Sequence, residues 1–230
     1  MSPDTLSVRL SRLYELAGAD YDVAWDLCCD HGYLGAALLF AGRAREVHLV
    51  DQVPGIMADL QTRVSTWPAG CQASVILHTE RAEWLSPVSG DHQLVMLAGV
   101  GGEKTGWILR ALTRFTEFAN ADWILSPAND GLEVRRCLNA LNFGLLKEGA
   151  VIENGWCYEY LKVRHRKNNT IRSVPRVGEF WDPGSDEHQR HLSRLRRHYG
   201  NQLKGRCPEK ARAALAAYQP LFERIDHRKA

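Results

Sequence analysis

The sequence has six cysteines but no C-x-x-C pair, so it lacks the spacing of common zinc and thioredoxin-type sites, and we expect no metal site. No stretch approaches 18 uninterrupted apolar residues. The first ten residues, MSPDTLSVRL, lack a basic segment followed by a long apolar one. We therefore expect neither secretion nor a membrane span. The scattered cysteines are expected to be reduced thiols of a cytoplasmic protein.

Internal repeats and low-complexity tracts are also absent. With 230 residues, 45% of them hydrophobic and 24% charged, the chain is long enough for one α/β domain with an appendage. The net charge of +2 is unevenly distributed: residues 161–230 carry 17 Lys and Arg against 7 Asp and Glu, and residues 1–160 have a net charge of −8. Such a basic tail favours a polyanionic partner, although a solvated helical surface explains a charge bias equally well.

Short apolar runs alternate with helical patterns along the first two thirds of the chain. The expected strands are 23–28, 46–51, 73–77, 93–98 and 123–126, and the expected helices are 6–17, 33–40, 55–67, 103–118 and 132–141. Two further strands, 145–153 and 157–166, flank Asn154-Gly155, a strong hairpin signal. The pattern predicts an α/β fold whose sheet is mostly parallel with an antiparallel C-terminal hairpin at one edge, as in Rossmann-like class I methyltransferases.

The C-terminal segment has a different pattern. Residues 168–185 contain two Pro and two Gly and are expected to be a loop or linker, which Phe180 and Trp181 dock onto the body. Residues 186–203 and 208–225 are compatible with helices and predict a small helical hairpin. We therefore divide the chain into a Rossmann-like domain, 1–166, and a basic helical extension, 167–230.

Open parallel sheets bind ligands at the carboxyl ends of their strands. The turn Asp26–Gly32, DLCCDHG, joins the first strand to its helix and fits neither G-x-G-x-x-G nor the P-loop. Asp51 ends the second strand about 20 residues later, where an acidic side chain can bind ribose hydroxyls. Glu80 and Arg81 follow the third strand, where an adenine amino group would be read. For an isolated Asp51, a turn or cap role is the competing interpretation.

Four motifs together resemble one enzyme family. They are 26–35 (DLCCDHGYLG), 98–102 (AGVGG), 126–129 (SPAN) and Tyr158-Glu159. In this order and spacing they are similar to the tRNA (adenine-22-N1)-methyltransferases, whose pattern reads roughly D-I-G-x-D-H-x-Y-L-P, A-G-M-G-G, Q-P-N and Y-E. The chain departs from it at Cys28 for the first glycine, Gly35 for proline, Val100 for methionine, and in one extra residue in SPAN.

The resemblance implies transfer of a methyl group from S-adenosyl-L-methionine to N1 of an adenine in the D-arm region of tRNA. Adenine N1 has its own lone pair, so the reaction needs an in-line approach rather than a strong base. Asp30 is the expected acceptor of the N6 proton, Asn129 an orienter of the base, and His31 either a substrate contact or a stabiliser of the turn. We predict catalytic roles for Asp30, His31 and Asn129.

Further residues are assigned to the cofactor and the substrate. Glycines at 99, 101 and 102 would let a flat base approach closely, and they also suit a tight turn. The predicted cofactor-binding residues are Arg9, Asp26, Cys28, Asp30, Gly32, Asp51, Gln52, Glu80, Arg81, Ala98, Gly99, Val100 and Gly101. The predicted substrate-binding residues are Tyr33, Gly102, Pro127, Arg194, Arg197, Lys204 and Arg206, the basic ones contacting phosphates.

Two other functions fit the same residues. One is a methyltransferase of this class that acts on another RNA or a small molecule. The other is a non-catalytic adapter that keeps the fold and binds RNA through the tail. The sequence leaves the oligomeric state open, a monomer included.

Overall fold

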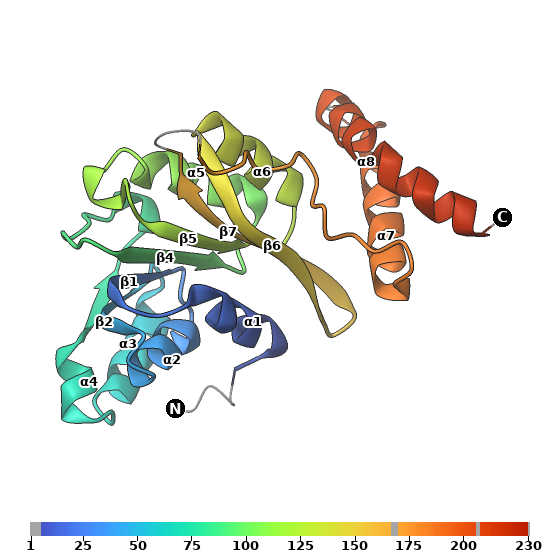
Figure 1. The fold of residues 1–230 in the computed structure, drawn as a ribbon. Helices are drawn as coiled ribbons and strands as arrows, with labels where there is room; N and C mark the ends of the chain where they lie inside the picture. Colours follow the sequence, from blue (N-terminus) through green and yellow to red (C-terminus); the bar gives the residue numbers. More distant parts are fainter. Residues whose placement is uncertain (1–5, 167–169, 206–207, 230) are drawn as a thin grey trace.

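An α/β domain is followed by a pair of helices in the computed structural model, which describes residues 6–166, 170–205 and 208–229 (Figure 1). The strands are β1 (Tyr21–Leu27), β2 (Ala44–Asp51), β3 (Val75–Thr79), β4 (Gln93–Ala98), β5 (Asp122–Ser126), β6 (Phe143–Glu153) and β7 (Trp156–His165). The helices are α1 (Val8–Ala17), α2 (Tyr33–Phe40), α3 (Pro54–Val64), α4 (Ala69–Ala73), α5 (Gly102–Leu112), α6 (Gly131–Ala140), α7 (Asp186–Gln202) and α8 (Pro208–Lys229). Two short 3-10 helices are η2 (Ala82–Trp84) and η3 (Thr116–Phe118).

The strands form one sheet in the order β3-β2-β1-β4-β5-β7-β6. Strands β1 to β5 are parallel, whereas β7 pairs antiparallel with both β5 and β6. The predicted fold class, a mostly parallel sheet with an antiparallel C-terminal hairpin at its edge, is therefore confirmed. The order reverses direction at β1, so β1 and β4 flank the switch point where such sheets bind ligands.

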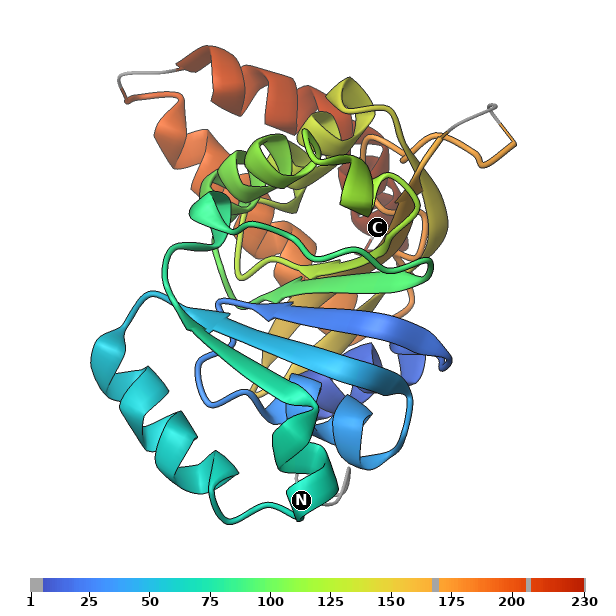
Figure 2. The same ribbon diagram turned by 90° about the vertical axis from the view of Figure 1, so that its left-hand side faces the viewer.

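Helices cover both faces of the sheet. Figure 2 shows α1, α2 and α3 on one side of the strands and α5 and α6 on the other. Strand β4, with the sequence QLVMLA, shows why both faces are needed: Leu94 and Met96 point into one hydrophobic core and Val95 and Leu97 into the other. A continuous apolar strand is stable only where both of its faces are covered.

The hairpin at the edge turns at Asn154-Gly155, as the sequence predicts. Both residues have positive φ, +50° and +75°. A two-residue turn with left-handed φ at both positions matches the right-handed twist of the two strands that it joins, which explains the preference for Asn-Gly there.

The C-terminal segment folds as the predicted helical hairpin and packs on the β6-β7 hairpin. Ser185 caps α7 by accepting a hydrogen bond from the His188 N–H, and a third hydrophobic cluster joins the two helices to Cys157 on β7. Trp181 is 4% exposed within this cluster, so the linker docks on the body as expected. The division of the chain at residues 166 and 167 stays a prediction.

Some helix boundaries differ from the prediction. Helix α3 ends at Val64 rather than Trp67, because the Ser65 and Thr66 hydroxyls donate to carbonyls of the last helical turn. The expected helix 103–118 ends at Leu112 and is followed by η3, and the five-residue α4 was not predicted. Within the residues described, none of the helices combines the length and the apolar composition that crossing a bilayer requires.

Candidate active site

The loop between β1 and α2 is held in an unusual backbone conformation. Cys28, Asp30 and Gly32 all have left-handed φ, at +53°, +50° and +62°. This region favours glycine, which accounts for glycine at the place of Cys28 in the family pattern. The Cys28 thiol is half-buried, and burial raises its pKa to about 11, so it is a neutral thiol at physiological pH.

Asp26 lies just before the end of β1 and is 6% exposed. Its Oδ2 accepts a hydrogen bond from the N–H of Gly35, 2.9 Å away. The proline of the family pattern has no N–H to donate at this position. The pKa of Asp26 is raised to about 7: burial is the main cause, the Gly35 hydrogen bond opposes it, and the Asp51 charge adds to it. A buried carboxyl with so shifted a pKa, facing a cavity, marks a candidate functional site.

Asp51, the last residue of β2, fixes the loops around it. One carboxylate oxygen accepts the N–H of Asp30 at 3.2 Å, and the other accepts the N–H of Val53 at 3.0 Å. The side chain therefore joins the loop after β1 to the start of α3. Each oxygen keeps a further lone pair, so the carboxylate can accept two hydroxyl groups from a ligand.

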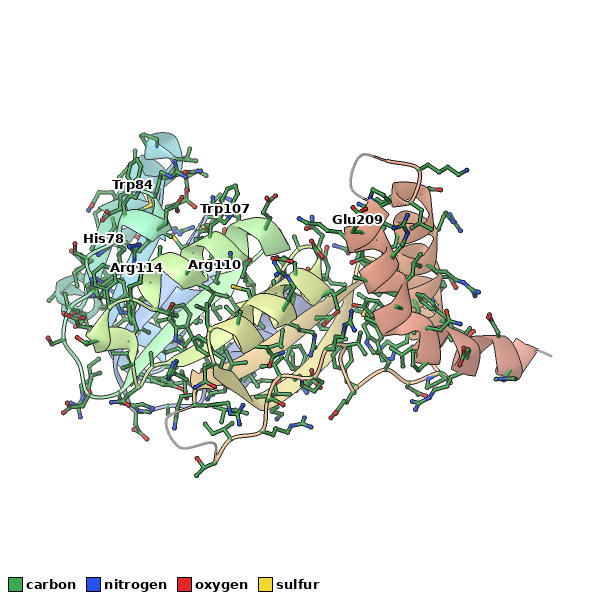
Figure 3. All side chains as sticks on the ribbon, turned by 90° about the horizontal axis from the view of Figure 1, so that it is seen from above. His78, Trp84, Trp107, Arg110, Arg114 and Glu209 are labelled. Atoms are coloured by element: carbon green, nitrogen blue, oxygen red, sulfur yellow. The ribbon has the colours of Figure 1, made fainter. Side chains whose placement is uncertain are left out.

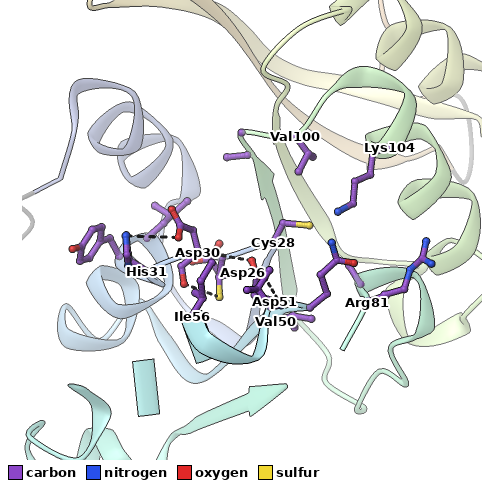
Figure 4. A pocket seen from close by; sticks show the side chains of 18 of the residues that line it. Asp26, Cys28, Asp30, His31, Val50, Asp51, Ile56, Arg81, Val100 and Lys104 are labelled. Carbon is purple, nitrogen blue, oxygen red and sulfur yellow. Dashed lines mark hydrogen bonds and ion pairs between the residues drawn. The ribbon is translucent and has the colours of Figure 1, made fainter. Parts of the chain in front are cut away.

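These side chains line a cavity of about 500 Å³ at the carboxyl ends of the central strands (Figure 4). Figure 4 shows Cys28 between Asp51 and Val100, with Lys104 extending from α5 toward the cavity. This volume falls within the range of small-molecule sites. The cavity is therefore large enough for a nucleoside-sized ligand.

Arg9 closes the cavity from α1. Its guanidinium lies 4.6 Å from the centre of the Tyr158 ring, and its backbone N–H donates to Glu153 at 2.9 Å. A Cβ added at Gly99 would lie 3.5 Å from Arg9 Nη2, so the guanidinium sits over the glycine after β4. The Nε of Arg9 is buried, and no described residue accepts a hydrogen bond from it. The guanidinium of Arg9 lines the cavity, and its charge suits a ligand carboxylate.

The glycine segment after β4 is joined to the loop after β5. The Gly99 N–H donates to the Ser126 carbonyl at 3.0 Å, and the Gly102 N–H donates to the Asn129 carbonyl at 3.2 Å. A Cβ at Gly101 would lie 3.0 Å from the Asn129 Oδ1, and one at Gly102 only 2.4 Å from the Asp130 carbonyl oxygen. These glycines therefore permit a close approach between two loops, and the Asn129 side chain lies against Gly101.

Asp30 and His31 occupy the opposite rim of the cavity. The Asp30 carboxylate lies 3.7 Å from His31 Nε2, and the two side chains are 65% and 56% exposed. His31 is also near Tyr33, with 5.4 Å between ring centres. At the third strand, Glu80 pairs with His78 at 3.3 Å, while Arg81 pairs with Glu83.

Most of the predicted site residues meet at this cavity. Those that line it are Arg9, Asp26, Cys28, Asp30, His31, Tyr33, Asp51, Gln52, Glu80, Arg81, Ala98, Gly99 and Val100. Gly32, Gly101, Gly102, Pro127 and Asn129 are not among its lining residues; Gly102 begins α5, and the other four belong to the adjoining loops. Their roles stay predictions.

The predicted residues of the tail lie elsewhere. Arg194 and Arg197 line a shallow groove along α7, together with Arg190. The Arg194 guanidinium lies 4.6 Å from the centre of the Trp156 ring and donates to the Gly155 carbonyl. Lys204 follows α7 and is exposed, whereas Arg206 lies outside the described residues.

The sequence analysis missed several residues that line the cavity: Leu10, Cys29, Leu34, Val50, Val53, Ile56, Ala82 and Lys104. Val53 and Ile56 belong to the first turn after Asp51, and Lys104 to the first turn after the glycine segment. A sequence signal for Val53, Ile56 and Lys104 existed: helices that follow parallel strands begin at the ligand crevice, so their first turns can line it.

The described His, Cys, Asp and Glu side chains form no group of three or more that could hold a metal ion.

A family model described as a methyltransferase domain matches residues 6–161, more than half of the chain. The chain belongs to this methyltransferase domain family. A curated protein of Mycoplasma pneumoniae, "Putative tRNA methyltransferase", is 27% identical to this chain over 154 residues, which are 64% of this chain. The match spans 65% of that relative, less than two thirds of its length.

Solved structures share the fold along nearly the whole chain. The B. subtilis M1A22 tRNA methyltransferase TrmK has 18% identity and a TM-score of 0.69, with 97% of this chain and 98% of that chain covered. M. capricolum TrmK in complex with S-adenosyl-homocysteine has 14% identity and a TM-score of 0.71, with 96% and 99% covered. At these identities the likeness shows the fold, including the helical tail of this methyltransferase.

Proposed function

We propose that this methyltransferase transfers a methyl group from S-adenosyl-L-methionine to N1 of an adenine in tRNA, at position 22 of the D-arm region. The observation that carries the proposal is the cavity in which Arg9, Asp26 and Asp51 converge. The Arg9 guanidinium matches the carboxylate of S-adenosyl-L-methionine, the buried carboxyl of Asp26 matches its ammonium, and Asp51 matches its ribose hydroxyls. The similar tRNA methyltransferases described above and the motif resemblance support the substrate.

The residues of the cavity fit the parts of this cofactor. The guanidinium of Arg9 binds the amino-acid carboxylate, and the buried carboxyl of Asp26 binds the ammonium. Asp51 accepts the two ribose hydroxyls, since its oxygens are already oriented by backbone N–H groups. Glu80 and Arg81 lie where the adenine ring would reach, with Ile56 as an apolar wall.

The loops after β4 and β5 hold the target base. Bound S-adenosyl-L-methionine supplies a sulfonium methyl group that the lone pair of adenine N1 attacks in line. Gly99 carries no side chain where the flat base would approach, and Asn129, whose side chain fills the space beside Gly101, orients the base by hydrogen bonding. Asp30 accepts the proton that N6 loses, because its exposed carboxylate stands on the cavity rim. His31 beside it contacts the substrate.

The tail binds the phosphates of the tRNA. Arg190, Arg194 and Arg197 line one groove of α7, and such side chains position a nucleic acid without reading its sequence. A folded tRNA is then recognised by shape and by one unstacked adenine in the cavity. We place this reaction in the cytoplasm.

The test is mass spectrometry of nucleosides from unmodified tRNA incubated with the protein and labelled cofactor. New, labelled 1-methyladenosine at position 22 is expected, and Asp51→Ala should abolish it together with cofactor binding by calorimetry. Cofactor binding without methylation of tRNA would reject the substrate, and a screen of total RNA and of metabolites would then identify the acceptor. A wild-type protein that binds no cofactor would instead favour the RNA-binding adapter.

A further inference from the structure

Two tryptophans beside the cavity are exposed to solvent. Trp84 is 67% exposed and Trp107 is 54% exposed. Four of the seven tryptophans are at most 9% exposed, so high exposure is not general to the tryptophans of this fold. Exposed aromatic side chains that gather on one surface, together with polar residues at its edge, mark interaction sites.

Both tryptophans follow closely along the chain after residues that line the cavity. Trp84 ends η2, directly after the cavity residues Arg81 and Ala82, and η2 packs against α5. Trp107 lies on α5 one turn after Lys104, which also lines the cavity. Figure 3 shows the two tryptophans on the same face of the molecule. A chain whose reacting base enters the cavity therefore has these two rings within reach.

Basic side chains accompany the tryptophans. The Arg81 guanidinium lies 4.9 Å from the centre of the Trp84 ring, and Figure 3 shows Arg110 near Trp107 and Arg114 further along. Arg110 and Arg114 are exposed, because the buried side of α5 holds Ile108, Leu109 and Leu112 instead. We call the surface formed by Arg81, Trp84, Lys104, Trp107, Arg110 and Arg114 the α5 face.

The acidic groups near the α5 face are partly occupied. Glu83 pairs with Arg81, and Glu133 pairs with Arg136 and lies 3.9 Å from Arg110. Glu103 is exposed in the first turn of α5, where it stabilises the helix N-terminus. Lys104 and Arg114 have no ion pair with the described residues, so the face keeps positive charge between its aromatic rings.

We propose that unpaired nucleotides next to the target adenine bind the α5 face, with bases stacked on Trp84 and Trp107 and phosphates at Lys104, Arg110 and Arg114. The proposal rests on the proposed RNA substrate and adds a second contact surface to the tail. Base stacking on aromatic rings tolerates any sequence, and interleaved cations neutralise the backbone. The combination suits single-stranded RNA better than a duplex, whose bases are stacked on one another.

The test compares Trp84→Leu/Trp107→Leu with Trp84→Phe/Trp107→Phe, which keeps the aromatic planes. Each protein is titrated with an unmodified tRNA transcript and with a single-stranded adenosine oligoribonucleotide. The leucine variant should raise both dissociation constants by about tenfold or more, and the phenylalanine variant by about threefold or less. The affinity for S-adenosylhomocysteine and the melting temperature should be unchanged, because neither ring lines the cavity or the core.

Equal binding of both RNAs by wild type and the leucine variant would overturn the proposal. So would a wild-type dimer in light scattering that the leucine variant converts to monomer, since the rings would then serve a second copy of the chain. Stacking-dependent binding of the oligonucleotide without methylation of tRNA would support the α5 face and reject the proposed substrate. Methylation of tRNA together with equal RNA binding by wild type and the leucine variant would support the proposed substrate and reject the α5 face.

Discussion

Replacing Asp26 by Asn should stabilise the protein at alkaline pH. Asparagine keeps an oxygen that can accept the Gly35 hydrogen bond, and it removes the buried charge. The pKa of Asp26 is about 7 in the folded protein against 3.8 for the free group. That difference corresponds to about 4 kcal/mol of stability lost when the carboxyl ionises. The gain approaches this value only if the new amide N–H groups find partners.

The gain should depend on pH with a defined sign. The stability that protonated Asp26 provides is fully present below pH 3.8 and is lost as pH rises through about 7. The difference in unfolding free energy between Asp26→Asn and wild type should thus be small near pH 4, grow toward pH 7 and stay constant above it. Comparing the two proteins cancels the titration of all other groups.

Cofactor binding should show the opposite preference. A ligand ammonium pairs with the ionised form of Asp26, so the affinity of wild type for S-adenosylhomocysteine should fall about tenfold between pH 8 and pH 6. Asp26→Asn should bind more weakly at pH 8, by about ten- to a hundredfold, and without this pH dependence.

Chemical denaturation and titration calorimetry from pH 4 to pH 8.5 measure both effects. Lower stability of Asp26→Asn than of wild type at pH 8 would refute the assigned cost of the buried charge. Equal wild-type affinities at pH 6 and pH 8 would refute the pairing of Asp26 with the ammonium.

The other predictions concern two glycines, the cysteines of the loop after β1, and Arg9. Gly102→Ala should destabilise the fold by about 1–3 kcal/mol in thermal unfolding, because its Cβ would lie 2.4 Å from a backbone oxygen, whereas Gly200→Ala in open space should stabilise α7 by about 0.5–1 kcal/mol. Cys28→Gly, at left-handed φ, should leave the melting temperature nearly unchanged, whereas Cys29→Gly should lower it; equal losses would contradict the backbone argument. Arg9→Ala should weaken binding of S-adenosylhomocysteine about tenfold but leave adenosine binding, which involves no carboxylate, unchanged in the same calorimeter.

Much of the fold follows from local sequence. The apolar run of β4, the Asn154-Gly155 turn and the alternation of strand and helix patterns are all short-range signals, and each predicted the element that the structure contains. The same holds for Asp51, since a strand end about 20 residues after the first loop is a position along the chain. The helix ends were less predictable, because hydroxyls such as that of Thr66 compete for the last carbonyls.

The sequence by itself thus determined which segments are strands and which acids stand at the strand ends. Only the tertiary structure decided that Arg9 lies over Tyr158, that the glycine segment is joined to Asn129, and that Lys104 reaches the cavity. It also set the shifted pKa of Asp26 and the exposure of Trp84. The physical reason is that burial, desolvation and contacts between distant segments depend on how the elements pack, and no local pattern encodes that packing.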